Sequence, residues 1–184
     1  MHISRKIMLI LSIFIMGMSA HCSAKLLYDN TGRITFETSD EWYYAPGEGD
    51  TMTYHLHSIV LDKDTAIILK QSKYPMKYES METIPAAEKS ILRDSILKQH
   101  ISALQEKGYV VTINKTDCLN DSIIVGLTVR KNDRIGRFVV AYYIKDYVAF
   151  SLCFMGTDDT IREVVNTVAT LKIDGIPFSE WISE

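Results

Sequence analysis

The chain has 184 residues, of which 47% are hydrophobic and 23% are charged, and its 23 acidic side chains outnumber its 20 basic ones. This balance argues against a nucleic-acid-binding protein, which normally carries a basic excess clustered on one face. About 160 residues remain after the first 24, which is the size of one compact domain. No linker, like-charge block or fixed-period repeat divides them.

Residues 1–24 have the order of a secretory signal peptide: positive charge, then an apolar run, then small side chains. Arg5 and Lys6 supply the charge, 7–16 form the apolar run, and the small residues extend to Ala24. A membrane span needs about 20 apolar residues, so this shorter run predicts a cleaved signal rather than a span. We therefore expect an exported protein that works in the periplasm or at the cell surface.

Two ways of processing this leader remain open. Cleavage after Ala20 or Ala24 would release a soluble chain, and cleavage after Ala24 would leave 18 basic against 23 acidic side chains. Lipidation of Cys22 would instead tether the protein to an envelope membrane, which is the only membrane contact that we expect. A lipidation signal has a small residue just before its cysteine, whereas this chain has His21 there, which favours the soluble form.

The first half of the remaining chain predicts three strands followed by one long helix. The strand predictions rest on alternating apolar residues at 33–38, 51–61 and 66–69. Pro85 and Gly108 mark the ends of the helix, because proline is tolerated in a first helical turn and glycine favours the position after the last. At 100° per residue, one apolar arc of this helix contains Ala87, Ile91, Leu97, Ile101 and Leu104, with Leu92 and Ile96 beside it.

The second half predicts four more strands and a second helix. The strands are expected at 109–115, 123–130, 136–144 and 148–155. Their connections are short and rich in turn-forming residues, so neighbouring strands must be antiparallel. A helix should follow Asp158 and Asp159, whose charges suit a helix N-terminus. The order predicts an α+β fold, an antiparallel sheet of about six to seven strands covered by the long helix and the C-terminal helix, in one domain over 25–173 with a tail at 174–184.

Three features of this layout carry a resemblance to a known family. A strand at 34–36 is followed shortly by Trp42, a long helix is inserted between a hairpin and an antiparallel meander, and the last helix ends in the segment 168–173. In these features the chain resembles the PsbP-like superfamily, which includes the DcrB-type bacterial proteins. The resemblance implies an α/β/α sandwich used mainly for binding, as in accessory subunits, adaptors and chaperones of secreted proteins.

Two stretches combine aromatic and basic side chains in a way that suits contacts with a protein partner. The loop after the first strand contributes Trp42, Tyr43 and Tyr44. The stretch before the long helix contributes Lys70, Lys73, Tyr74, Lys77 and Tyr78. Each has an ordinary alternative, since Trp42 could plug the core and the second stretch could be a solvated connection. We expect the partner to be another exported or envelope protein.

Two further polar features have both a functional and a structural interpretation. One predicted hairpin turn is bracketed by Arg130, Lys131, Arg134 and Arg137. These side chains could bind an anion, or they could keep the tip of the hairpin soluble. Asp94 falls within the apolar arc of the long helix, where it could be a buried acid or pair with Arg93.

His55 and His57 alternate along a predicted strand, so both imidazoles leave the same face and could be two ligands of a zinc or copper ion. Such a site would support the alternative function of a small metal-assisted hydrolase. It needs further ligands, and beyond the leader the chain has only one more histidine, His100, and no HExxH or CxxC motif. We therefore expect a polar strand face at these histidines rather than a metal site.

Cys118 and Cys153 are the two cysteines beyond the leader. An exported protein could join them in a disulfide, or it could bury both as small apolar side chains. The sequence contains no motif typical of a nucleophilic elbow, a phosphate-binding loop or a dinucleotide-binding turn. We therefore predict a non-enzymatic binding protein without a cofactor.

Overall fold

The computed structural model describes residues 25–28, 34–39, 41–45, 49–50, 52, 54–119, 121–173 and 175–181. The predictions about the leader, including cleavage and the lipidation of Cys22, lie outside these residues. In the described part of the chain, no helix is both long enough and apolar enough to cross a membrane.

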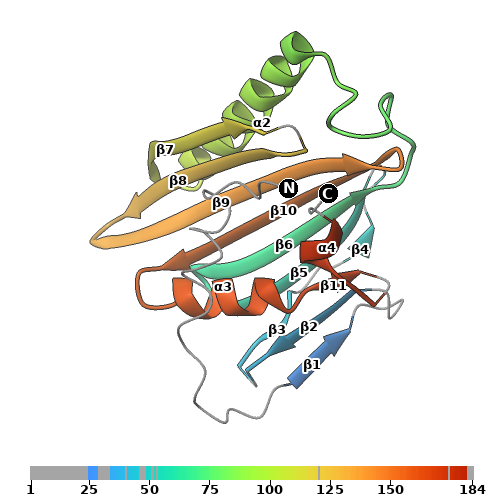
Figure 1. Ribbon diagram of the computed structural model, residues 1–184. Helices are drawn as coiled ribbons and strands as arrows, with labels where there is room; N and C mark the ends of the chain where they lie inside the picture. The colour runs from blue at the N-terminus through green and yellow to red at the C-terminus, as the bar shows by residue number, and fades with distance from the viewer. Residues whose placement is uncertain are drawn as a thin grey trace, which may run out of the picture.

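The described residues form two antiparallel sheets and three helices (Figure 1). The large sheet has the strand order β3 (Tyr43–Tyr44), β5 (Tyr54–Asp62), β6 (Thr65–Ser72), β10 (Val148–Thr157), β9 (Arg134–Lys145), β8 (Ile123–Lys131) and β7 (Val110–Cys118), with β4 (Gly49–Asp50) also paired to β5. The small sheet has the order β1 (Lys25–Tyr28), β2 (Ile34–Thr38), β11 (Lys172–Ile173) and β12 (Ile176–Pro177). The helices are α2 (Ala86–Glu106), α3 (Ile161–Ala169) and α4 (Phe178–Trp181).

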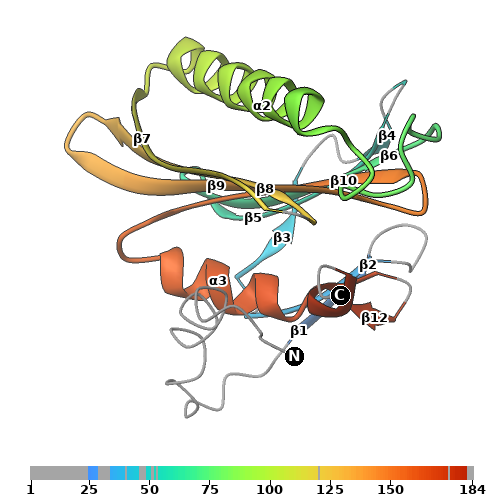
Figure 2. The ribbon, with the colours of Figure 1, turned by 45° about the horizontal axis from the view of Figure 1, so that its top comes forward.

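The elements stack in three layers around the large sheet. Figure 2 shows α2 over one face of that sheet, and α3 with the small sheet over the other. This confirms the predicted α+β class with helices on both faces. One strand lies elsewhere than the chain order suggested: β2 does not join the large sheet but pairs with β11, where Ile34 stands opposite Ile173.

Strand register assigns the side chains of the large sheet to its two faces. Leu69 of β6 pairs with Leu152 of β10, and Thr65, on the same face, has its hydroxyl 2.8 Å from that of Thr160, which precedes α3. Ile68 pairs with Cys153 on the opposite face, toward α2. We call these the α3 face and the α2 face. Because alternate residues of a strand point to opposite sides, the same assignment extends across the sheet.

Helix α2 begins after Pro85 and ends before Gly108, as the sequence predicted. Pro85 precedes its first residue, and Gly108, with a φ of 82°, follows its C-terminal Lys107. The side of α2 that is buried, however, differs from the side that the sequence predicted. Ile96 and Leu104 are buried, whereas Ile91 is 68% exposed.

The same rotation moves Asp94 out of the interior. Its carboxylate is exposed and accepts a hydrogen bond from Arg93 Nε at 2.8 Å, which is the structural alternative that the sequence allowed. His100 takes a place on the inward side of α2, with its ring centroid 5.4 Å from that of Phe138 on β9. The arc was misjudged because polar residues such as His100 share the covered face with the aliphatic ones.

The segment expected as a C-terminal tail is part of the fold. It contributes β12 and α4, and Phe178 is buried against Tyr143 with the ring centroids 5.3 Å apart. The backbone N–H of Phe178 also donates to the carbonyl of Leu171 at 2.8 Å. The folded domain therefore extends beyond residue 173, because these apolar side chains close the layer beneath the α3 face.

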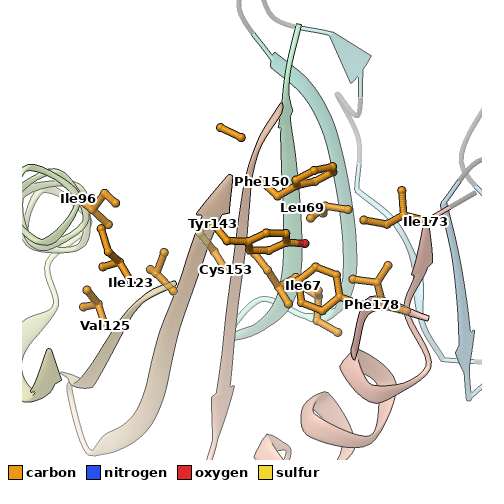
Figure 3. Packing of buried hydrophobic residues seen from close by; sticks show 14 of the residues in the cluster. Ile67, Leu69, Ile96, Ile123, Val125, Tyr143, Phe150, Cys153, Ile173 and Phe178 are labelled. Carbon is orange, nitrogen blue, oxygen red and sulfur yellow. The ribbon is translucent and has the colours of Figure 1, made fainter. Parts of the chain in front are cut away.

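Tyr143 places a polar atom in this apolar layer. Its ring stacks on Phe150 at 5.2 Å, and Figure 3 shows it among Ile67, Leu69 and Phe178. The hydroxyl is buried and has no hydrogen-bond partner among the described residues. Burial raises the pKa of Tyr143, so the hydroxyl stays protonated and its donor is unsatisfied.

Tyr143→Phe should therefore stabilise the protein. An unsatisfied buried donor costs about 1–3 kcal/mol, and phenylalanine keeps the ring while removing that cost. We expect the free energy of unfolding, measured by urea denaturation, to rise by about 1 kcal/mol. Tyr74→Phe, at an exposed tyrosine, should leave it unchanged; a loss of stability in Tyr143→Phe would show that the hydroxyl has a partner.

Candidate functional site

Helix α2 covers only part of the α2 face of the large sheet. Helix α2 packs mainly on β7 and β8, at one side of the sheet. The α2-face residues of β6 and β10 that lie farther across, including Ile68, Lys70, Ser151 and Met155, are only partly buried. This face therefore offers both solvent access and apolar floor, which a binding site requires.

An open pocket of about 400 Å³ lies at one end of this face. We call it the tip pocket, because the β5–β6 turn and the β8–β9 turn form its rim. Its lining residues are Lys63, Asp64, Tyr109, Val129, Lys131, Asn132, Asp133, Arg134, Ile135, Gly136, Met155 and Thr157. Apolar residues of three neighbouring strands form its floor, and charged residues stand at its rim.

Asp64 organises the rim of the tip pocket. Its carboxylate accepts hydrogen bonds from Arg134 on the facing turn and, at 3.4 Å, from the hydroxyl of Tyr109. Burial and the neighbouring Asp64 carboxylate raise the pKa of Tyr109, so its hydroxyl remains a donor. Lys131 Nζ donates to the carbonyl of Lys107 at 2.8 Å and lies 5.1 Å from the Tyr109 ring centroid. These contacts tie the two turns to the end of α2, so the pocket is largely formed without a ligand.

A second group of chemically capable side chains lies farther along the α2 face. Cys153 Sγ on β10 is 3.9 Å from His100 Nε2 on α2 and 3.7 Å from Ser151 Oγ. Lys70 of β6 pairs with Ser151 in the register, so it stands on the same face. We call Lys70, His100, Ser151 and Cys153 the interlayer cluster.

The protonation states of the interlayer cluster follow from its burial. Burial, with a smaller effect of the Lys70 charge, lowers the pKa of His100 to about 4, so the imidazole is neutral at pH 7. Burial also raises the pKa of the Cys153 thiol, against smaller opposing effects of Ser151 and Lys70. A cysteine nucleophile needs a thiolate, usually beside a protonated imidazole. Both shifts favour the uncharged forms of the two side chains, so the cluster offers a neutral nitrogen and a thiol sulfur to a ligand.

The first predicted binding stretch is divided between core and surface. Trp42 is fully buried (0% exposed), and its Nε1 donates to Glu163 Oε1 at 2.8 Å. This placement corresponds to the core role and removes Trp42 from the contact surface. Tyr43 is exposed on the edge strand β3, while Tyr44 points to the α3 face and is half-buried.

The second stretch is largely folded back onto the protein. Tyr78 Oη donates to Glu88 Oε2 at 2.7 Å, and Lys77 Nζ lies 3.3 Å from the same oxygen. Both interactions lower the pKa of Glu88, which sits in the first turn of α2. Lys73 is half-buried, and Tyr74 is 65% exposed. Of this stretch, Tyr74 is the aromatic side chain that a partner could reach most easily.

The three histidines that the metal prediction considered do not converge. His57 pairs with Leu69, so His55 and His57 point to the α3 face, whereas His100 contacts Cys153 on the α2 face. Among the described residues, no group of three or more His, Cys, Asp or Glu side chains could hold a metal ion. The large sheet itself separates His100 from the pair.

The disulfide, one of the two alternatives that the sequence left open for Cys118 and Cys153, is not formed in this structure. Cys118 lies on β7 and Cys153 on β10, with β8 and β9 between them. Neighbouring strands are about 4.8 Å apart, so three steps place the two cysteines about 14 Å apart. A disulfide needs Cα atoms within about 7 Å. Both are free thiols, with Cys118 exposed and Cys153 buried, so the alternative of two buried thiols holds for Cys153 alone.

Sequence reasoning found part of the tip pocket and missed the interlayer cluster. The basic hairpin turn was visible as a pattern, and Lys131 and Arg134 from it line the pocket. Nothing in the sequence pairs this turn with Lys63 and Asp64, which precede it by about 70 positions. His100 and Cys153 come from a helix and a strand, so no local spacing indicates their contact.

Comparisons with known proteins identify a fold. No model of a protein family matches the chain, and no curated protein matches it. Among solved structures, the chain is similar to cyanobacterial PsbP (CyanoP) from Synechocystis sp. PCC 6803, with a TM-score of 0.50 and 9% identity over 85% of this chain and 96% of that one.

A crystal structure from Bacteroides thetaiotaomicron VPI-5482 aligns with 82% of this chain at 11% identity and a TM-score of 0.45. This chain spans about half (48%) of the length of that protein. At such identities the likeness concerns the fold alone. The chain has a PsbP-like fold, as the layout of its sequence predicted.

Proposed function

We propose that this chain is an exported, non-enzymatic accessory protein that uses the tip pocket to bind an acidic segment of another exported protein. Export rests on the signal-like order of residues 1–24. The lack of a known catalytic motif in the sequence favours binding over catalysis.

The observation that carries the proposal is the charge of the tip pocket. Lys63, Lys131 and Arg134 stand around its rim, against the two carboxylates of Asp64 and Asp133. The pocket therefore has a local excess of positive charge, although the whole chain has a net charge of −3. A local field opposite to that of the whole protein steers acidic ligands to one place on the surface.

The floor of the pocket favours a partner segment that also carries an apolar side chain. Val129 and Met155 line it below the charged rim. A partner segment that carries a carboxylate next to an apolar side chain would therefore satisfy both parts. Arg134 donates to Asp64 through Nη1, and its other N–H groups can donate to a carboxylate of the partner, which gives orientation as well as attraction.

The proposal predicts that reversing the rim charges abolishes capture of the partner. Tagged wild-type protein is exported in its own cells, recovered with its partner, and compared with Lys63→Glu/Lys131→Glu, which leaves the Asp64–Arg134 pair in place. We expect partner recovery to fall at least tenfold, and wild-type binding to weaken as salt is raised, since exposed charges are screened.

The matched control carries the same change in net charge elsewhere. Lys98→Glu/Lys115→Glu alters exposed positions on α2 and β7 that do not line the pocket, and should retain the partner. Thermal melting of both double variants shows whether either has lost its fold. Equal recovery by the two double variants would refute the tip pocket, and loss of recovery in Tyr74→Ala would move the contact to the stretch before α2.

A further inference from the structure

The charges that line the tip pocket limit the anion that it can hold. The lining contains three cationic side chains, Lys63, Lys131 and Arg134, and two carboxylates, Asp64 and Asp133. Three positive and two negative charges leave a net charge of +1. One carboxylate of a partner would neutralise this charge, whereas a doubly charged phosphate would leave an excess of negative charge in the pocket.

Two of the three cations already have partners inside the protein. Arg134 donates to Asp64 through Nη1, so its remaining N–H groups are the ones that can reach a ligand. Lys131 Nζ donates to the carbonyl of Lys107 at 2.8 Å. Lys63 is exposed. A partner would therefore meet Lys63 and part of the Arg134 guanidinium, rather than three free cations.

The helix end beside the pocket does not favour a doubly charged anion. It is the C-terminal end of α2, where Lys107 offers its carbonyl to Lys131 and the helix dipole is negative. Phosphate sites in proteins commonly use the opposite end of a helix, whose free N–H groups point at the anion. The attraction of the tip pocket for an anion therefore comes from its side-chain charges.

Asp64 is the carboxylate that most directly opposes a bound anion, because Arg134 would hold both. The backbone N–H of Asp64 donates to Asp62 Oδ1 at 2.7 Å, and Tyr109 Oη donates to its carboxylate at 3.4 Å. These contacts keep the Asp64 charge in place. Two carboxylates on one guanidinium lie about 6 Å apart, and at that distance in water one charge changes an affinity by about threefold. A dianion would feel twice this repulsion energy, which is a factor of about nine.

We propose that the tip pocket selects a singly charged carboxylate of the partner over a phosphate group, and that Asp64 sets this selectivity. The inference rests on the proposed function and names the acidic group, which is a glutamate or aspartate side chain rather than a phosphorylated residue. Asp64 holds Arg134 at the rim through one N–H and opposes a second negative charge beside it. The same residue therefore positions the guanidinium for one anionic group and disfavours a more highly charged one.

The test titrates the full chain, labelled with ¹⁵N, with three capped tripeptides and follows binding by NMR. The peptides carry glutamate, glutamine or phosphoserine between two leucines. Wild type should bind the glutamate peptide more tightly than the glutamine peptide, and the phosphoserine peptide no more tightly than the glutamate peptide. Asp64→Asn keeps an oxygen that can accept from Arg134 and removes the charge. It should raise the affinity for the glutamate peptide about threefold and for the phosphoserine peptide about ninefold.

The controls separate this selectivity from a general effect of charge. Asp117→Asn carries the same change in net charge on β7, outside the pocket lining, and should leave both affinities unchanged. Asp133→Asn removes the other rim carboxylate and should shift the preference in the same direction as Asp64→Asn. Melting curves show whether each variant is folded, and Asp133→Asn decides the question if Asp64→Asn is unfolded.

The outcomes distinguish this inference from the proposed function. Equal gains for both acidic peptides in Asp64→Asn, or a wild-type preference for the phosphoserine peptide, would overturn the selectivity and leave acidic binding standing. If wild type bound the glutamate peptide no more tightly than the glutamine peptide, the proposed function would fail and the selectivity would fail with it.

Discussion

Trp42→Ala should lower the free energy of unfolding by about 3–5 kcal/mol, which is the range for truncating a buried tryptophan. Trp42 lies in the segment between β2 and β3, is fully buried, and donates from its Nε1 to Glu163 of α3 at 2.8 Å. The same carboxylate oxygen accepts from Ser39 Oγ at 2.7 Å. Truncation would leave a cavity and remove one of the two donors that hold α3 to the segment after β2. Urea denaturation of both proteins measures the difference.

Two further variants divide this loss into packing and hydrogen bonding. Trp42→Phe keeps most of the ring and removes the donor, so it should cost less than Trp42→Ala. Glu163→Gln tests the acceptor, and the double variant Trp42→Phe/Glu163→Gln measures the coupling between the two side chains. A coupling of zero would show that Glu163 makes no energetic contribution through Trp42, and a loss below about 1 kcal/mol in Trp42→Ala would contradict the core placement.

The stability of the protein should fall as the pH is lowered from about 6.5 to about 4, because of His100. Burial lowers the pKa of His100 from 6.5 to about 4 in the folded state. In this range the unfolded chain binds the proton and the folded chain does not, so protonation favours unfolding. Above pH 6.5 the imidazole is neutral in both states and does not lower the free energy of unfolding. Between pH 6.5 and 4 the free energy of unfolding falls by about 2 kcal/mol, once partial solvent access is allowed for.

The variant His100→Gln isolates this contribution from that of the carboxylates. The free energy of unfolding of each protein is measured at pH 7 and at pH 4.5. The change between the two pH values is then compared between wild type and variant, so that the effects of the other titrating groups cancel. The groups facing His100 are Lys70 of β6, Cys153 of β10 and the ring of Phe138 on β9, and Ser151 lies beside Cys153. Parallel pH profiles for the two proteins would contradict the burial of His100 in its neutral form.

Local patterns were sufficient for most of the strands and both main helices. Strand alternation and turn formation are set by residues within a few positions of one another. The sequence was therefore enough to predict β5, β6, β8, β9, β10 and the turns between them. Pro85 and Gly108 act on their own turns, so the limits of α2 could be predicted as well. Short connections also required antiparallel neighbours, and the register confirms this for β8, β9 and β10.

Longer-range contacts could not be predicted from the sequence. Pairing of Ile34 with Ile173 joins residues from opposite ends of the domain, and it depends on a second sheet that no local period indicates. Phe178 belongs to the core because its ring packs against Tyr143 on the α3 face, a contact between residues 35 positions apart. The rotation of α2 was misjudged for a similar reason, since the sheet beneath it, and not its own apolar arc, sets which side is covered.

The candidate sites divide in the same way. By itself the sequence determined the signal-like leader, the α+β layout, the absence of known catalytic motifs and the basic hairpin turn that becomes half of the tip pocket. Only the tertiary structure placed Lys63 and Asp64 opposite that turn, set His100 against Cys153, and put the large sheet between His100 and the other two histidines. Chemistry at a site depends on distances across elements, and those distances are fixed by packing between layers rather than by spacing along the chain.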